Sequence, residues 1–286
     1  MREGVRLFDE LVEVYGLAVL SWAGIDIDGA EAMAIARELA ATVDGFAIGV
    51  GATSYPRTWR ARLRTNRWAQ SLIREVRRGT RQPDERTALA RVAETDLTDA
   101  VAAVELLNIV RPTVAVAYFG AYAAQALDAH PDWKRRLATG SADELKAFEH
   151  EVRRWYPFTP LLTGRMVTEY VWEGRTFPPG SWMVLDVIGT NHDPRRWVEP
   201  HCFRPERFLD REPDAFDYVP HGGGEVDAGH RCPGEPLAVG ILEATLRLLG
   251  GLDFDVADES KTVEMGRVPS LPPQHMELHS VHRTGP

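Results

Sequence analysis

The sequence predicts a mainly α-helical fold with a small β portion, and two observations carry this prediction. Apolar residues recur at helical spacing through the first half of the chain, whereas the second half turns to short apolar runs broken by Pro and Gly. The composition, 44% hydrophobic and 26% charged, is that of a globular protein. We expect one domain over residues 1–286.

Helices account for the first half of the chain. Asp96 begins the longest one, whose thirty-odd residues would span about 50 Å. Pro112 lies inside it and lacks an N–H, so we expect a kink or loosening there. Pro157 ends the last helix of this half. The expected helices cover residues 5–22, 29–46, 60–78, 96–129 and 143–155.

The second half is expected to hold the strands. Two strands are predicted, Val167–Val171 and Ser181–Val187, with Pro178-Pro179-Gly180 as the turn between them. Residues 188–231 are rich in Pro, Gly, Asp and Arg, and so long an irregular stretch within a domain is usually functional. A helix over 235–249 and short strands within 252–282 are expected to follow.

Charge and cysteine content exclude several classes of protein. The net charge is −9, which disfavours nucleic acid as a partner because phosphate binding requires a positive field. Two cysteines, Cys202 and Cys232, rule out a disulfide scaffold and a four-cysteine zinc site, and they suit a cytoplasmic protein. The N-terminal segment has acidic residues within its apolar pattern and is not expected to be a signal peptide. Residues 109–127 are almost uncharged, but their Ala-rich composition favours a buried core helix over a membrane span.

Residues 57–81 are strongly basic, with nine Arg and a single acidic residue, Glu75. We interpret this segment as a solvated helix face with acidic residues from elsewhere packed against it. The alternative is a patch that docks an anion or a partner protein.

The most informative stretch is the loop of residues 220–235, in which five glycines surround Cys232. Glycines let the backbone approach a flat group closely, and a helix start favours the thiolate form of a cysteine. His230 and Arg231 add positive charge beside it. A single thiolate held in this way suits the axial ligand of haem iron. An inert buried cysteine and a nucleophilic cysteine are the alternatives, and the spacing does not support zinc.

This loop resembles the haem-thiolate loop of the cytochrome P-450 superfamily, and three further stretches agree with it. Glu151-Val-Arg-Arg154 resembles the superfamily's Glu-x-x-Arg element, Phe203–Phe208 resembles its meander, and His192–Trp197 is also similar. The resemblance implies a P-450-type helical fold and haem b with the Cys232 thiolate as axial ligand. The other residues that it assigns are His230, Arg231 and Gly234 in the haem-binding loop and a structural charge cluster of Glu151, Arg154 and Arg207.

The loop departs from the general pattern of the superfamily in a way that resembles one branch. Glu225, Ala228 and His230 stand where Phe, Gly and Arg are usual. The form Gly-Gly-Gly…Gly-His-Arg-Cys-Pro-Gly-Glu instead resembles the bacterial fatty-acid peroxygenases. Those enzymes use hydrogen peroxide directly, so the resemblance implies that no redox partner is required.

Arg111 is the only charged residue between Ile109 and Gln125, and no acidic residue lies one helical turn from it. A buried guanidinium needs an anion. It could be a ligand carboxylate, an acidic residue from elsewhere in the fold, or solvent reached by the end of the side chain. The peroxygenases carry Arg-Pro at this place, so the resemblance implies that Arg111 and Pro112 are catalytic and that Arg111 binds the fatty-acid carboxylate. That carboxylate would serve as the acid–base group for peroxide, giving hydroxylation at the α or β carbon with decarboxylation as a side reaction.

The resemblance begins at about Arg2, which aligns with a middle helix of the family fold. A large N-terminal part of that fold has no counterpart here, so we expect the chain alone to hold haem poorly. Two other functions stay open. One is a conventional monooxygenase that needs an electron-transfer partner, and the other is a truncated, non-catalytic haem-binding remnant.

Overall fold

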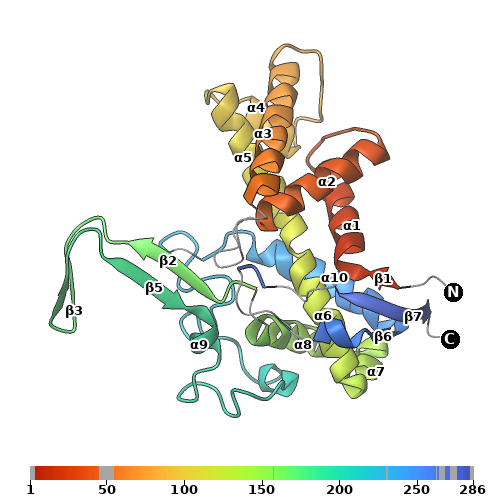
Figure 1. Ribbon diagram of the computed structural model, residues 1–286, viewed down its shortest axis with the longest axis vertical. Coiled ribbons are helices and arrows are strands. Elements are labelled where there is room, and N and C mark those ends of the chain that lie inside the picture. Colours follow the sequence, from red (N-terminus) through yellow and green to blue (C-terminus); the bar gives the residue numbers. More distant parts are fainter. Residues whose placement is uncertain are drawn as a thin grey trace.

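The structure is a computed structural model that describes residues 4–44, 55–156, 158–229, 231–261, 263, 268–270 and 276–283. Helices dominate it, and three small sheets lie at its periphery (Figure 1). The helices are α1 (Leu7–Trp22), α2 (Gly29–Asp44), α3 (Tyr55–Arg77), α4 (Ala88–Ala93), α5 (Asp99–Ala115), α6 (Ala117–Ala129), α7 (Pro131–Thr139), α8 (Ala142–Trp155), α9 (Val187–Asn191) and α10 (Glu235–Gly250). The strands are β1 (Val5–Arg6), β2 (Leu161–Arg165), β3 (Tyr170–Trp172), β4 (Arg175–Phe177), β5 (Trp182–Asp186), β6 (Leu252–Val256) and β7 (Glu277–Arg283). The predicted mainly α fold is confirmed.

The long helix expected over 96–129 is divided into α5 and α6, and the division is not at Pro112. The α-helix continues through Pro112 and is interrupted at Val116, whose N–H donates to the Thr113 carbonyl at 3.2 Å. The expected kink was therefore wrong by about one turn. Pro112 removes one hydrogen bond, and the turns around it are held by buried neighbours such as Val110 and Val114.

Of the two strands predicted in the second half, Ser181–Val187 is confirmed as β5, whereas the other is wrong. Val167–Val171 is not one strand, because β2 ends before it and β3 begins within it. β2 pairs antiparallel with β5, from Leu161 opposite Asp186 to Arg165 opposite Trp182, whereas β3 pairs with β4. No residue of β2 or β5 is buried, and β2, unlike β5, was not predicted from the sequence. The β2–β5 sheet lies to the left of the helices in Figure 1.

The core of the molecule is built around α6. Tyr118, Phe119, Tyr122 and Leu127 are each at most 2% exposed. Residues 99–129 are long and apolar enough to cross a membrane by length and composition alone, and half of their most apolar window is buried inside the protein. The burial favours the core-helix interpretation of this segment.

Helix α3 runs antiparallel to α5 (Figure 1). The last turn of α3 bonds to the first residue of α5, since Arg74 Nε lies 3.0 Å and Arg77 Nη1 2.8 Å from the Asp99 carboxylate. Nearer its start, Arg64 pairs with Glu38 of α2 at 2.8 Å. These ion pairs fit the interpretation of the basic segment as a solvated face with acidic residues packed against it.

Candidate functional site

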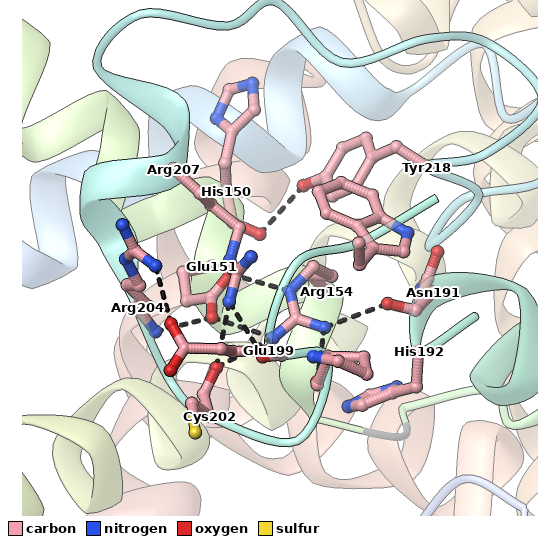
Figure 2. Close-up of polar contacts among 12 residues, drawn as sticks. His150, Glu151, Arg154, Asn191, His192, Glu199, Cys202, Arg204, Arg207 and Tyr218 are labelled. Atoms are coloured by element: carbon pink, nitrogen blue, oxygen red, sulfur yellow. Dashed lines mark hydrogen bonds and ion pairs between the residues drawn. The ribbon is translucent and has the colours of Figure 1, made fainter. Parts of the chain in front are cut away.

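Helix α8 supplies the buried end of a charge cluster. Its start is fixed by a capping box between Ser141 and Glu144. At its other end Glu151 and Arg154, both 0% exposed, form a bidentate pair with N–O distances of 2.7 and 2.8 Å. In Figure 2 the Arg154 side chain extends between Glu151 and Asn191. The predicted partners thus lie one helical turn apart on one face.

The remaining hydrogen-bonding groups of this pair are met by the irregular segment 191–207. Arg154 donates to the backbone carbonyls of Asn191, Pro200 and Cys202 at 2.9 to 3.3 Å. Glu151 Oε1 accepts the backbone N–H of Arg204 at 2.6 Å. Buried charges are tolerated when they are paired and fully bonded, so this pair holds the irregular segment against α8.

Arg207 is the third member of the cluster. Its Nε lies 3.2 Å from Glu151 Oε2, close enough for an ion pair although the alignment is not that of a hydrogen bond. Its Nη atoms donate to the carbonyls of Val198, Glu199 and Cys202. The structure therefore brings Glu151, Arg154 and Arg207 together (Figure 2).

A second buried network, which the sequence analysis missed, joins α8 to the cysteine loop. Arg153 is 2% exposed and pairs with Glu149 one turn back, and its Nη1 lies 2.8 Å from Glu235 Oε1 at the start of α10. Glu235 Oε2 accepts from Arg231 Nε at 2.6 Å. Burial alone would raise the pKa of Glu235, but the Arg231 hydrogen bond and the charge of Arg153 outweigh it and lower that pKa to about 2. Only the run of charged residues on α8 hinted at this network.

Cys232 is half-buried and lies just before α10. Its N–H donates to the His221 carbonyl at 2.9 Å, and its carbonyl accepts the Glu235 N–H at 3.2 Å. The helix begins at Glu235, and Pro233 lies ahead of it. A Cβ added at Gly234 would lie 3.7 Å from the Cys232 sulfur. The glycine therefore keeps open the space beside the sulfur, as a flat ligand would require.

The donor set also fits haem. Across the described part of the chain, no group of three or more His, Cys, Asp or Glu side chains could hold a metal ion. A single thiolate suits an iron whose other ligands come from its own macrocycle. Arg231 stands beside Cys232 with its guanidinium bonded to Glu235, whereas His230 lies outside the described residues.

His221 connects the cysteine loop to α6. Its ring stacks on Phe119, with centroids 5.4 Å apart and an interplanar angle of 14°. Arg111 lies eight residues before Phe119 along α5 and α6, about 12 Å along the helix axis. Arg111 and the cysteine loop therefore lie along the same stretch of the α5–α6 pair.

Arg111 is half-buried, and its Nη2 donates to Asn108 Oδ1 at 3.1 Å. Among the described residues no carboxylate lies within ion-pair distance of it, so an acidic residue from another described element is not its partner. Burial, and then the positive charge of Arg62, lower the pKa of the Arg111 guanidinium. Within the described part of the chain, its charge is therefore met by the Asn108 amide oxygen and by no carboxylate.

Comparisons with known proteins agree with this geometry. The family model described as Cytochrome P450 matches residues 144–264, which include most of α8, the charge cluster and the cysteine loop. A solved structure of cytochrome P450SP alpha in complex with (R)-ibuprophen superposes with a TM-score of 0.90 at 35% identity, covering 99% of this chain and 70% of that chain. Wild-type cytochrome P450EX alpha with myristic acid superposes with a TM-score of 0.89 at 34% identity and the same coverage.

Among curated proteins, tabersonine 16-hydroxylase 2 of Catharanthus roseus is 35% identical over 126 residues, which make up 42% of this chain and 24% of that enzyme. The match therefore spans about a quarter of the length of this plant relative. The family match, the structural likeness and the 35% identity over most of a solved relative agree. The chain belongs to the cytochrome P450 family.

Proposed function

We propose that this protein is a haem-thiolate peroxygenase that uses hydrogen peroxide to hydroxylate long-chain fatty acids at the α or β carbon, with decarboxylation as a side reaction, in the cytoplasm. One observation carries the proposal. Arg111 lies next to Pro112 on α5, just before the helix α6 whose Phe119 stacks on the cysteine loop, and it has no carboxylate within ion-pair distance among the described residues.

Members of this family hold haem through a cysteine thiolate. In this chain Cys232 would be that ligand, because it is half-buried and Gly234 leaves space beside its sulfur. Arg231 and Glu235 hold the backbone around it through their ion pair. When bound, haem supplies the redox chemistry, since a thiolate ligand favours cleavage of the O–O bond.

Arg111 would bind the fatty-acid carboxylate in a bidentate fork, which a guanidinium offers and an ammonium does not. A carboxylate fixed there presents the first carbons of the chain for reaction, and it can take and return the proton of peroxide. Pro112 carries no N–H and so offers no donor at this place. A conventional monooxygenase of the family carries an acidic residue followed by Thr at this place, and that pair delivers protons to bound oxygen. Here Arg111 and Pro112 take the place of that pair, and the buried Thr113 lies one position too late.

The test is Arg111→Ala in the haem-loaded protein, with myristic acid and hydrogen peroxide as substrates. We expect peroxide-driven turnover to fall about a hundredfold, because a charge-assisted bidentate contact contributes about 3 kcal/mol. Arg60→Ala, which removes an exposed arginine from α3, is the matched control and should leave turnover unchanged.

Two results would point to the other functions. Unchanged turnover in Arg111→Ala, together with activity that depends on an electron-transfer protein and reductant, would indicate a conventional monooxygenase. The similarity to a plant hydroxylase over 42% of this chain favours this as the second candidate. Loaded, folded protein with no product under either condition would indicate a non-catalytic remnant.

A further inference from the structure

We propose that Arg62 on α3 is a second binding residue for the acid group of the substrate, standing opposite Arg111 across the contact between α3 and α5. This inference rests on the proposed function, because it assigns Arg62 to the same carboxylate. It makes Arg62 a specificity-determining residue that favours free acids over neutral esters.

The register of the two helices places these arginines level with each other. Helices α3 and α5 are antiparallel and are fixed at one end by the pair between Arg74 and Asp99 at 3.0 Å. Arg62 lies twelve residues before Arg74, and Arg111 lies twelve residues after Asp99. Each step is about 18 Å along its helix at 1.5 Å per residue. Because the helices run in opposite directions, the two steps end at the same level.

Arg62 lies on a side of α3 that is buried further along the helix. Residues 62, 66, 69, 73 and 77 share this face by helical spacing. Ala69 and Ile73 are fully buried, and Arg77 bonds to Asp99 of α5. Arg62 thus continues a packed stripe to its exposed end, whereas Arg60 lies on the opposite side of the helix.

The positive charges of Arg62 and Arg111 favour binding of an anion between them. Other arginines of α3 are neutralised, Arg64 by Glu38 and Arg74 by Asp99. For Arg62 and Arg111, the described residues provide no carboxylate within ion-pair distance. Arg62 is the charged neighbour whose field acts on Arg111, lowering its pKa in addition to the effect of burial. Two like charges repel, and a carboxylate bound between them removes that repulsion and gains an attraction to each.

Myristic acid and its methyl ester, titrated separately into the purified haem-loaded protein by calorimetry, test this role directly. We expect Arg62→Ala to weaken binding of the acid about fivefold, less than the roughly hundredfold loss in Arg111→Ala, because Arg62 is exposed to solvent. Binding of the ester should stay within about twofold. Arg62→Lys should retain most of the affinity, and Arg60→Ala, the matched control, should retain all of it.

The variants separate failure of this inference from failure of the proposed function. If Arg62→Ala binds the acid as Arg60→Ala does, while Arg111→Ala loses the preference for acid over ester, the role of Arg62 is refuted and the proposed function stands. If Arg111→Ala keeps that preference, or if the unaltered protein shows none, the carboxylate site itself is refuted. Circular dichroism of each variant checks that its fold is kept.

Discussion

Replacing Glu151 by Gln isolates the contribution of one buried charge to the stability of the fold. The carboxylate is 0% exposed, accepts two N–H groups from Arg154 and one from the Arg204 backbone, and lies 3.2 Å from Arg207 Nε. The amide is similar in size but carries no charge, and its NH₂ group would face the donors of Arg154. Two guanidinium groups would then lack their anion.

The expected cost follows from burial. Removing one partner of a buried ion pair costs about 3–5 kcal/mol, because the remaining charge cannot be solvated. For a protein of this size that corresponds to a fall in Tm of about 6–10 °C. Urea unfolding followed by far-ultraviolet circular dichroism at neutral pH measures the loss in free energy of unfolding.

Glu199→Gln is the matched control, since Glu199 pairs with Arg204 in the same segment but is 57% exposed. A pair so exposed contributes less than about 1 kcal/mol. A loss below about 1 kcal/mol in Glu151→Gln, equal to that of the control, would show that the cluster does not hold the irregular segment against α8.

Three further predictions concern other parts of the molecule. Gly120→Ala should cost about 1–3 kcal/mol in urea unfolding, because the added Cβ would come within 2.4 Å of Leu11 Cδ1. Burial raises the pKa of Tyr15 from 10.0 to about 12, so its contribution to stability is complete below pH 10 and is lost as the pH rises to 12; Tyr15→Phe should unfold with a weaker pH dependence over that window. Cys232→Ser should abolish the thiolate-type absorption of the reduced carbonyl complex in haem-loaded protein, whereas Cys202→Ser should leave that spectrum unchanged.

Much of the helical fold could be predicted because its helices carry an apolar stripe. Helix α1 shows it clearly, with Phe8, Leu11, Val12 and Tyr15 all buried. The sequence could not show where the long helix is interrupted. Pro112 indicates a lost hydrogen bond, whereas the interruption at Val116 involves neither Pro nor Gly. Strand β2 was missed, whereas its partner β5, which likewise has no buried residue, was predicted from its apolar run.

The candidate site was predicted where its residues belong to short recognisable motifs, as Glu151, Arg154 and Arg207 do. Arg153 was not found, although it is as deeply placed, because its partner Glu235 is more than eighty residues away and burial of a charge leaves no mark in the sequence. Arg62 was likewise hidden among nine arginines of one basic segment. The register of α3 against α5 and its effect on Arg111 distinguish it from its neighbours.

The sheet formed by β2 and β5 determines where the molecule first opens. Two strands without a buried face have little apolar contact to lose, so separating them costs far less than unfolding the helices. Backbone amides of these strands should exchange with deuterium soon after dilution into heavy water. Those of α6 should exchange only through global unfolding. A protease given limited time should cut the chain here and spare the helical body.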